Sequence, residues 1–349
     1  MFSGLGIGML IVIDFLVFAT ALVVARYFTR PASRIHLLDH PGSRSLHQRP
    51  IPRTGGIAIM AAGLVGGALI GWILPVLRDS LGFLLLGLGP LAVVSLLDDR
   101  YGIPFQWRLP VHVWVAASLI FAGGTLDRLE LPGFAWSLPG WLASLFTLLF
   151  AVWMINLYNF MDGMDGFAGG MAVIGFATLA WLGRADAGFA AVCLTVAAAS
   201  AGFLVHNFPP ARIFLGDAGS TTLGFLAAAC SLWGGKTGLF PFWAALLVFS
   251  PFIVDATVTL LRRLLRGEKI WEAHRTHHYQ RLVLLGWGHR RTVLAEYALM
   301  LACAGSAVLA VHLSPVGQAS LALGWILIYG VLMRAVGRLE RRRATVSVP

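Results

Sequence analysis

Charged residues are scarce in this chain of 349 residues, and so are cysteines. Asp, Glu, Lys and Arg make up 12% of the sequence, against about 25% in a typical soluble domain. Cys193, Cys230 and Cys303 lie singly inside apolar runs, which excludes a Cys-x-x-Cys metal site and argues against a disulfide framework. With 58% hydrophobic residues and a mean hydropathy of +0.79, the composition indicates a polytopic membrane protein in contact with membrane lipid.

The formal net charge of +10 does not point to a nucleic-acid partner. The basic residues lie mostly in the segments between apolar runs, where Lys and Arg are topology signals. We therefore expect no nucleic acid among the partners.

A bilayer core requires about 20 apolar residues per helix. On this basis we predict an all-α fold with about eleven transmembrane helices in a single domain, residues 1–349. The first helix should be retained, because no basic segment precedes it and no small-residue cleavage site follows it. The expected spans are 3–25, 56–77, 81–97, 109–124, 139–157, 167–183, 187–205, 218–235, 239–261, 292–312 and 315–334.

Eleven spans place the two termini on opposite sides of the membrane. Most of the 26 Lys and Arg residues then fall on the side of the C-terminus, which predicts a cytoplasmic C-terminus and an external N-terminus. All the polar clusters fall on the same predicted cytoplasmic side. We expect the loops there to form one active site: 26–55, 98–108, 158–166, 206–217 and 262–291.

Asp98 and Asp99 end the third predicted span. Two adjacent carboxylates repel each other, and either a divalent cation or the neighbouring Arg100 would relieve that repulsion. A solvated helix end with a salt bridge is the simpler interpretation. Mg²⁺ prefers one or two carboxylates together with substrate phosphates, and the pair suits that preference as well.

Asn159, Asp162 and Asp165 recur every three residues after the fifth predicted span. If the helix continues, they share one face, and if Gly163 and Gly166 open the backbone, they line a loop. Helix capping explains one of these residues but not all three.

Asp217 stands where the eighth predicted span begins. A helix N-terminus has free N–H groups and the positive end of the helix dipole, which suits a phosphate. Asp217 could cap this helix or bind a metal ion.

The loop 262–291 combines His274, Arg275, His277, His278 and Arg281. The spacing lacks the cysteine or carboxylate partner of a zinc site. Mixed arginines and histidines favour a clamp for a diphosphate, and contact with anionic lipid is the alternative.

Asp255 lies within the ninth predicted span, where a carboxylate is usually functional or paired. An ion pair with Arg262 and a catalytic role are both open.

Together these motifs resemble the polyprenyl-phosphate N-acetylhexosamine-1-phosphate transferases, a group within glycosyltransferase family 4. The resemblance runs in order from about Asp39 to Arg281. The matching segments are Asp39-His-Pro with Arg44-Ser-Leu-His47 and Pro52-Arg53-Thr-Gly-Gly, Asp98-Asp99, Asn156-Leu-Tyr-Asn159-Phe-Met-Asp162-Gly-Met-Asp165-Gly, Phe214-Leu-Gly-Asp217-Ala-Gly-Ser, Pro251-Phe-Ile-Val-Asp255 and the histidine-rich loop.

The resemblance implies attack of undecaprenyl phosphate on a UDP-N-acetylhexosamine, with release of UMP and a requirement for Mg²⁺, for which Mn²⁺ could substitute. It implies that Asp217 binds the metal directly and that Asp98 and Asp99 lie near the metal and the lipid phosphate. Whether Asp98 removes a proton or the phosphate attacks already ionised stays open.

The remaining roles also follow from the resemblance. Asp98, Asp99, Asp162, Asp165 and His277 would belong to the catalytic centre, and Asp98 and Asp99 would join Asp217 as metal residues. The substrate-binding residues would be Arg44, His47, Arg53, Asn159, Asn207, His274, Arg275, His278 and Arg281.

The spacing of the histidine loop is similar to that of the branch that starts O-antigen synthesis. It lacks the three consecutive histidines of the pentapeptide translocases. The family implies a bacterial inner membrane location and allows a homodimer. The donor sugar stays open between UDP-GlcNAc and UDP-linked deoxy amino sugars.

A hydrophobic groove near the glycine-rich residues 60–71 is expected to hold the prenyl chain. A secondary transporter of an anionic solute is the alternative from another class. Transporters usually place such charges near the bilayer midplane in repeated halves, whereas here the charges gather at one face.

Overall fold

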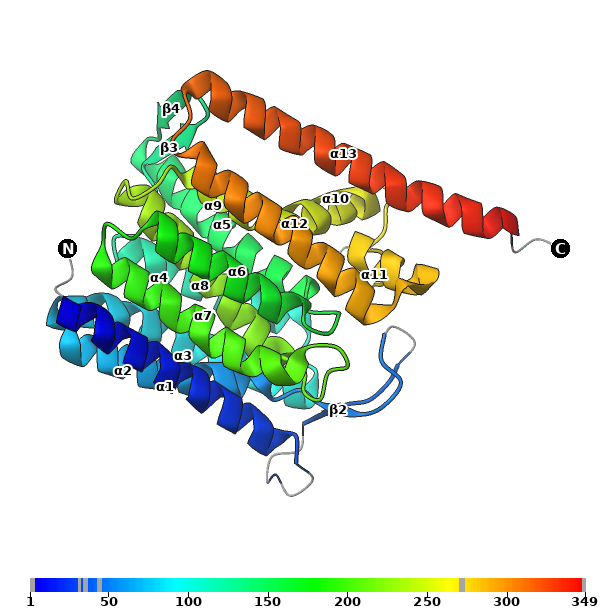
Figure 1. Ribbon diagram of the computed structural model, residues 1–349, viewed down its shortest axis with the longest axis horizontal. Coiled ribbons are helices and arrows are strands. Elements are labelled where there is room, and N and C mark those ends of the chain that lie inside the picture. The colour runs from blue at the N-terminus through cyan, green and yellow to red at the C-terminus, as the bar shows by residue number, and fades with distance from the viewer. Residues whose placement is uncertain (1–3, 31–32, 34–36, 43–45, 270–273, 347–349) are drawn as a thin grey trace.

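The computed structural model describes residues 4–30, 33, 37–42, 46–269 and 274–346. Most of them form helices that lie side by side in one bundle (Figure 1). The helices are α1 Gly4–Phe28, α2 Gly55–Ile73, α3 Arg78–Tyr101, α4 Phe105–Phe121, α5 Gly140–Phe160, α6 Phe167–Leu182, α7 Ala187–Asn207, α8 Gly216–Lys236, α9 Phe242–Val248, α10 Ser250–Leu265, α11 His278–Leu282, α12 Gly288–Ala310 and α13 Pro315–Val346, with short helical turns η1 Pro75–Leu77 and η2 Val283–Trp287.

Two small antiparallel ribbons modify the predicted all-α fold. Strand β1 (Leu38–Asp39) pairs with β2 (Ile51–Pro52), and β3 (Arg128–Leu131) pairs with β4 (Phe134–Ser137). The second ribbon closes through Pro132-Gly133, where Gly133 has a φ of +77°. Proline followed by a glycine with positive φ favours a tight turn, which the helix-based interpretation of the chain overlooked.

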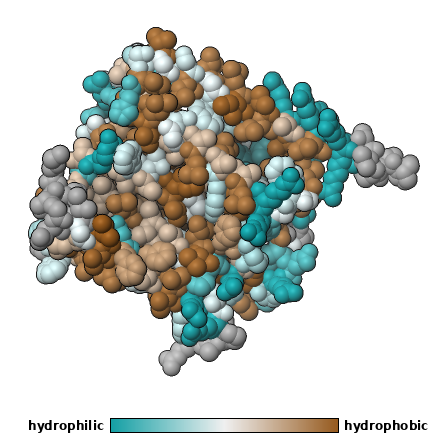
Figure 2. Space-filling model, in the orientation of Figure 1, coloured by the Kyte–Doolittle hydropathy of each residue, from teal (hydrophilic) through white to brown (hydrophobic). Residues whose placement is uncertain are grey.

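Six helices in the described part of the chain are long and apolar enough to cross a membrane, or seven if α9 and α10 form one bent span. A helix lies in each of the eleven predicted ranges, but the count of eleven crossings and the orientation stay predictions. Helix α6 has 16 residues, fewer than the roughly 20 that a bilayer core requires. Figure 2 shows hydrophobic residues over much of the visible face, as expected for a polytopic membrane protein.

The ninth predicted span, 239–261, is not one continuous helix. It breaks at Phe249 into α9 and α10, which are bent by 78°. Pro251 has no N–H group and cannot donate to the carbonyl of Leu247. The hydroxyl of Ser250 donates to that carbonyl instead, at 2.7 Å, so the break leaves no unpaired backbone oxygen there.

The predicted loop 262–291 is also partly helical. Helix α10 continues to Leu265, and α11 and η2 precede α12 within this range. The prediction ended the helix at its first arginines, Arg262 and Arg263, but long basic side chains can reach polar surroundings from a helix that continues.

Helix α8 lies at the centre of the bundle and contacts α2, α3, α5, α6, α7 and α9. Nearly every residue from Ala218 to Leu232 is buried. Gly56 of α2 and Gly219 of α8 allow the two backbones to touch, because a Cβ atom on Gly56 would lie 2.2 Å from the nitrogen of Gly219. This contact fixes the start of α2 against the start of α8.

Substitution of Gly56 tests this close approach. Gly56→Ala should lower the thermal midpoint of the purified protein in detergent, at a cost of about 1–3 kcal/mol, because the clash is with backbone atoms that cannot rotate away. Gly67→Ala in the same helix meets no atom within 4 Å and should leave the midpoint unchanged or raise it. Equal midpoints for the two variants would contradict the proposed contact.

Candidate active site

Several helix ends that are distant in sequence meet at one end of the bundle. The N–H groups of Gly55 and Gly56 at the start of α2 donate to the carbonyls of Phe214 and Leu215 before α8, at 2.9 and 2.7 Å. The ends of α3, α5 and α7 reach the same place through the side chains described below. Between them lies an acidic cavity of about 260 Å³. Its lining includes Asp39, His47, Arg53, Asp99, Asp162, Asp165, Asn207, Asp217, Gln280 and His289.

Asp99 caps α8 from the end of α3. Its two carboxylate oxygens accept the N–H groups of Asp217 and Ala218, at 2.9 and 3.1 Å, while Leu215 at the N-cap offers no side-chain bond. A carboxylate at this position is favoured by the helix dipole. These two N–H groups, which would suit a phosphate, are therefore already paired with Asp99.

Arg108 joins two of the predicted carboxylates. Its Nη1 atom forms an ion pair with Oδ2 of Asp98 and lies 3.3 Å from Oδ2 of Asp217. The other oxygen of Asp98 accepts the N–H of Ile103 at 2.7 Å, and Asp98 does not line the acidic cavity. Asp217 is 31% exposed and also accepts a 2.8 Å bond from Asn159. Arg100, the partner considered from the sequence, forms a cation–π contact with Tyr101.

The segment after α5 is a loop rather than a continued helix. α5 ends at Phe160, and Gly166 has a φ of +75°. Asn159 points to Asp217, whereas Asp162 lines the acidic cavity. Burial, followed by the charges of Asp217 and other nearby carboxylates, raises the pKa of Asp162 well above its usual value.

Asp165 anchors this loop to two other elements. Its Oδ2 atom accepts the N–H of Ala211 at 2.9 Å, and its Oδ1 atom lies 2.9 Å from Nδ1 of His289 in α12. Arg108 and His289 lie in the loops 98–108 and 262–291 that were expected to form the site, but neither was named as a site residue. His289 stands in a basic run that resembled a topology signal, and only the carboxylates opposite these two residues reveal their position.

The side chain of Asn207 joins two backbone segments at the acidic cavity. Its carbonyl oxygen accepts the N–H of Gly166 at 2.9 Å, and its amide group donates to the carbonyl of Ile213 at 2.8 Å. Asn207 is buried, with 4% of its surface exposed. These bonds use the carboxamide to join two loops.

Two nitrogen atoms at the cavity have no hydrogen-bond partner within the described residues, Nε2 of His47 and Nε of Arg53. His47 lies 3.6 Å from Asp39 and packs edge-on against Phe214. Buried donors without partners are costly, and a phosphate oxygen would satisfy them. Arg44, predicted to bind substrate, lies outside the described residues.

Asp255 organises the histidine cluster. It accepts the N–H of His278 at 2.9 Å and that of Tyr279 at 3.3 Å, and it lies 2.9 Å and 3.5 Å from the Nδ1 atoms of His278 and His277. It therefore caps α11. The suggested pairing of Asp255 with Arg262 is wrong, because Arg262 contacts Nε2 of His278 instead, at 3.2 Å.

The residues predicted to form a diphosphate clamp do not line one cavity. Arg275 and Arg281 line a separate cavity and not the acidic one, and Arg281 forms a two-pronged ion pair with Glu340 of α13. Burial, with the charges of His277 and Arg263, lowers the pKa of His274 to about 4, so its imidazole is neutral at pH 7.

The acidic cavity suits a hard divalent cation. Five of its lining residues are aspartates, at positions 39, 99, 162, 165 and 217. Within the described residues, no three His, Cys, Asp or Glu side chains form a complete metal site. A cation such as Mg²⁺, which keeps waters and takes one or two carboxylates plus substrate oxygens, agrees with this arrangement.

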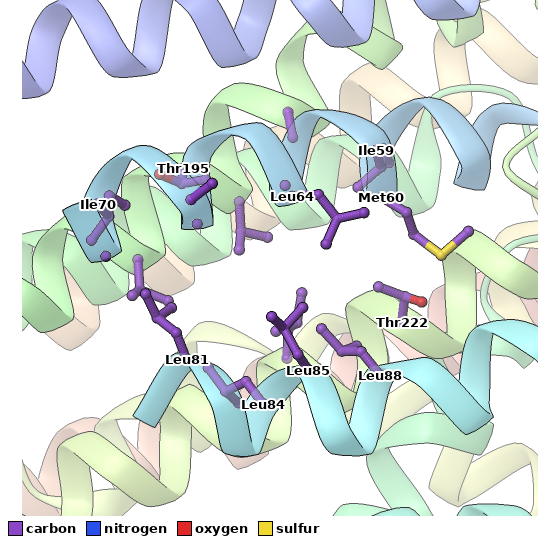
Figure 3. Close-up of a pocket in the computed structure, with 18 of the residues that line it drawn as sticks. Ile59, Met60, Leu64, Ile70, Leu81, Leu84, Leu85, Leu88, Thr195 and Thr222 are labelled. Atoms are coloured by element: carbon purple, nitrogen blue, oxygen red, sulfur yellow. The ribbon is translucent and has the colours of Figure 1, made fainter. Parts of the chain in front are cut away.

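An apolar cavity of about 650 Å³ lies between α2, α3, α7 and α8. Figure 3 shows Ile59, Met60 and Leu64 on one side of it and Leu81, Leu84, Leu85 and Leu88 of α3 on the other. Its lining includes most of the residues 60–71 where a groove was expected. Thr222 is five residues from Asp217 along α8, which is about 8 Å, so this cavity begins close to the acidic one.

Comparison with known proteins agrees with this geometry. The sequence profile of glycosyl transferase family 4 matches residues 81–235. A probable undecaprenyl-phosphate N-acetylglucosaminyl 1-phosphate transferase of Bacillus subtilis is 32% identical over 83% of this chain and 82% of its own length. A decaprenyl-phosphate N-acetylglucosaminephosphotransferase of Mycobacterium tuberculosis is 29% identical over 90% and 87%. An undecaprenyl-phosphate alpha-N-acetylglucosaminyl 1-phosphate transferase of Escherichia coli is 28% identical over 76% and 74%.

Bundle and site together define a multi-pass bacterial membrane enzyme. The chain belongs to glycosyl transferase family 4, and its relatives are polyprenyl-phosphate N-acetylglucosamine-1-phosphate transferases.

Removal of the Asn207 carboxamide separates its structural role from substrate binding. Asn207→Ala should destabilise the protein by about 1–3 kcal/mol, because it leaves a buried N–H and a buried carbonyl unpaired. Thermal unfolding in detergent measures this. Asn156→Ala is the comparison, since Asn156 donates to the carbonyl of Val152 in its own helix and contacts the His112 side chain, but joins no two loops. An unchanged midpoint with a raised donor KM would instead make Asn207 a substrate contact.

Proposed function

We propose that this enzyme transfers an N-acetylhexosamine 1-phosphate from a UDP-sugar to undecaprenyl phosphate. The products are a lipid-diphosphate sugar and UMP. The observation that supports this most is the adjacency of the acidic and apolar cavities at the start of α8. A water-soluble sugar nucleotide and a lipid acceptor require a site with both kinds of surface.

The prenyl chain would occupy the apolar cavity and its phosphate would reach toward the start of α8. Nε of Arg53 and Nε2 of His47 would donate to phosphate oxygens, because they lie 3.8 Å from Asp99 and 3.6 Å from Asp39 without forming a hydrogen bond there. An oxygen of the lipid phosphate forms a bond to the β-phosphorus of the donor, and the bond from that phosphorus to the bridging oxygen breaks. The bridging oxygen leaves with UMP.

This transfer does not require Asp98 as a base. A phosphate monoester is largely dianionic at pH 7, and Asp98 is held by Arg108 and by the N–H of Ile103. We assign Asp98 and Arg108 to positioning Asp217. Asp165 and His289 hold the loop that presents Asp162 to the cavity.

Asp217 and Asp162 are the residues that would hold Mg²⁺, or Mn²⁺ in its place, together with substrate phosphates. When bound, the cation would neutralise charge on the diphosphate as it develops. Asp99 fits this role less well, because both of its oxygens already accept helix N–H groups.

UDP-GlcNAc is the donor that the names of the relatives favour, and deoxy amino sugars remain alternatives. We place the site on the cytoplasmic side of the bacterial inner membrane, as the distribution of Lys and Arg predicts. The lipid product would start O-antigen or a related envelope polysaccharide, and a homodimer is the assembly that we propose.

Asp217→Asn should abolish most of the transfer. The substitution removes a charge from the proposed cation site, and we expect at least about a hundredfold lower kcat. Release of UMP from UDP-GlcNAc, with undecaprenyl phosphate and Mg²⁺ present, measures this, and other UDP-HexNAc donors identify the sugar.

Asp127→Asn, an exposed aspartate beside β3, serves as the control and should retain activity. Chelation with EDTA should stop UMP release, and added Mg²⁺ should restore it. Normal turnover by Asp217→Asn would exclude this carboxylate from the cation site.

Filling the apolar cavity should weaken binding of the long acceptor. Gly63 lines this cavity and a Cβ atom there meets nothing within 4 Å. Gly63→Phe should raise the KM for undecaprenyl phosphate about tenfold or more and affect a short prenyl phosphate less. Gly305→Phe, in open space on α12, is the matched control. Equal KM values for Gly63→Phe and wild type would place the prenyl chain elsewhere.

A further inference from the structure

A third cavity, which we call the arginine cavity, lies between α10, η2 and α13. Its volume is about 630 Å³. The lining residues are Thr259, Arg262, Arg263, Arg266, Arg275, Thr276, Arg281, Leu284, Leu285, Glu340 and Arg343. It shares no lining residue with the acidic cavity.

The positive charge of this cavity is not balanced by its own lining. Six of its residues are arginines and only Glu340 is acidic, and Glu340 is paired with Arg281. Glu268 lies near the rim, 3.3 Å from Arg263 and 3.9 Å from Arg266. Even with both glutamates counted, the positive charges are in excess. Arginine forks of this kind match the oxygen atoms of a phosphate group.

Leu284 and Leu285 are the apolar residues of the cavity wall, and exposed leucines cover the opposite face of α10. Leu261, Leu264 and Leu265 of α10 are 52%, 56% and 87% exposed, and Leu284 on the cavity wall is 47% exposed. At about 3.6 residues per turn, the three leucines of α10 lie roughly half a turn from Arg262, Arg263 and Arg266. Helix α10 is therefore amphipathic, which suits the boundary between acyl chains and headgroups.

The bend between α9 and α10 creates this arrangement. Since α10 turns by 78° from α9, its arginine end lies alongside α13 (Figure 1), whose C-terminal end supplies Glu340 and Arg343 to the cavity. Figure 2 shows hydrophilic residues gathered at that end of α13. Arg343 closes the cavity by donating to the carbonyl of Leu284 at 2.7 Å.

We propose that the arginine cavity binds the phosphate of an anionic membrane phospholipid, with the acyl chains running past Leu284 and Leu285 toward the leucine face of α10. The occupant is a lipid rather than a free phosphate because apolar surface adjoins the charge. The site touches the histidine cluster through the 3.2 Å contact of Arg262 with His278.

Lipid binding to the purified protein in neutral detergent tests this proposal. Native mass spectrometry would count bound phosphatidylglycerol, with phosphatidylcholine as the zwitterionic comparison. Phosphatidylglycerol should bind at least about tenfold more tightly, and Arg266→Gln with Arg275→Gln should weaken it by roughly fivefold for each charge removed. Higher salt should weaken binding to the unaltered protein, a measurement that needs no variant to fold.

The matched control is Arg26→Gln with Arg30→Gln, which removes two charges at the end of α1, away from the arginine cavity. It should bind phosphatidylglycerol like wild type. Equal affinity for the two lipids, or no loss in the Arg266 and Arg275 variant, would overturn the proposal. Binding of inorganic phosphate without binding of phosphatidylglycerol would also overturn it. A raised donor KM in the Arg266 and Arg275 variant with unchanged lipid binding would instead assign these arginines to the nucleotide.

Discussion

The carboxylate of Asp99 at the start of α8 is the interaction on which the rest of the site depends. It joins the end of α3 to the backbone of Asp217 and Ala218, and so determines where Asp217 stands. The cap also explains why two aspartates follow each other at the end of α3. Asp99 supports the helix and Asp98 supports Arg108, which in turn contacts Asp217.

Asp255 does for α11 what Asp99 does for α8. Each carboxylate lies on one helix and accepts two N–H groups at the start of another. In both cases the orphan donors of a helix N-terminus and its dipole favour the charge. The pattern assigns Asp99 and Asp255 to positioning, and Asp217 and Asp162 are the carboxylates of the acidic cavity that we assign to the cation.

Much of the site could be predicted from the sequence because its residues follow apolar runs on one predicted side. Asp99, Asp162 and Asp217 meet in one cavity as expected. The sequence did not single out Arg108 or His289, since a basic residue near a helix end has the same appearance whether it faces lipid headgroups or a carboxylate. The expectation that Arg275 and Arg281 join the other site residues failed for a related reason, as they line the arginine cavity while their neighbour Gln280 lines the acidic one.

The sequence by itself determined that the chain is a polytopic membrane protein and which family it resembles, because hydropathy and ordered motifs are properties of local segments. Tertiary structure alone decided which helix N–H groups remain available and that α10 turns away from α9. It also decided that Arg281 pairs with Glu340 rather than lining the acidic cavity. These outcomes depend on the distance between atoms of segments remote in the chain, and no local pattern encodes that distance.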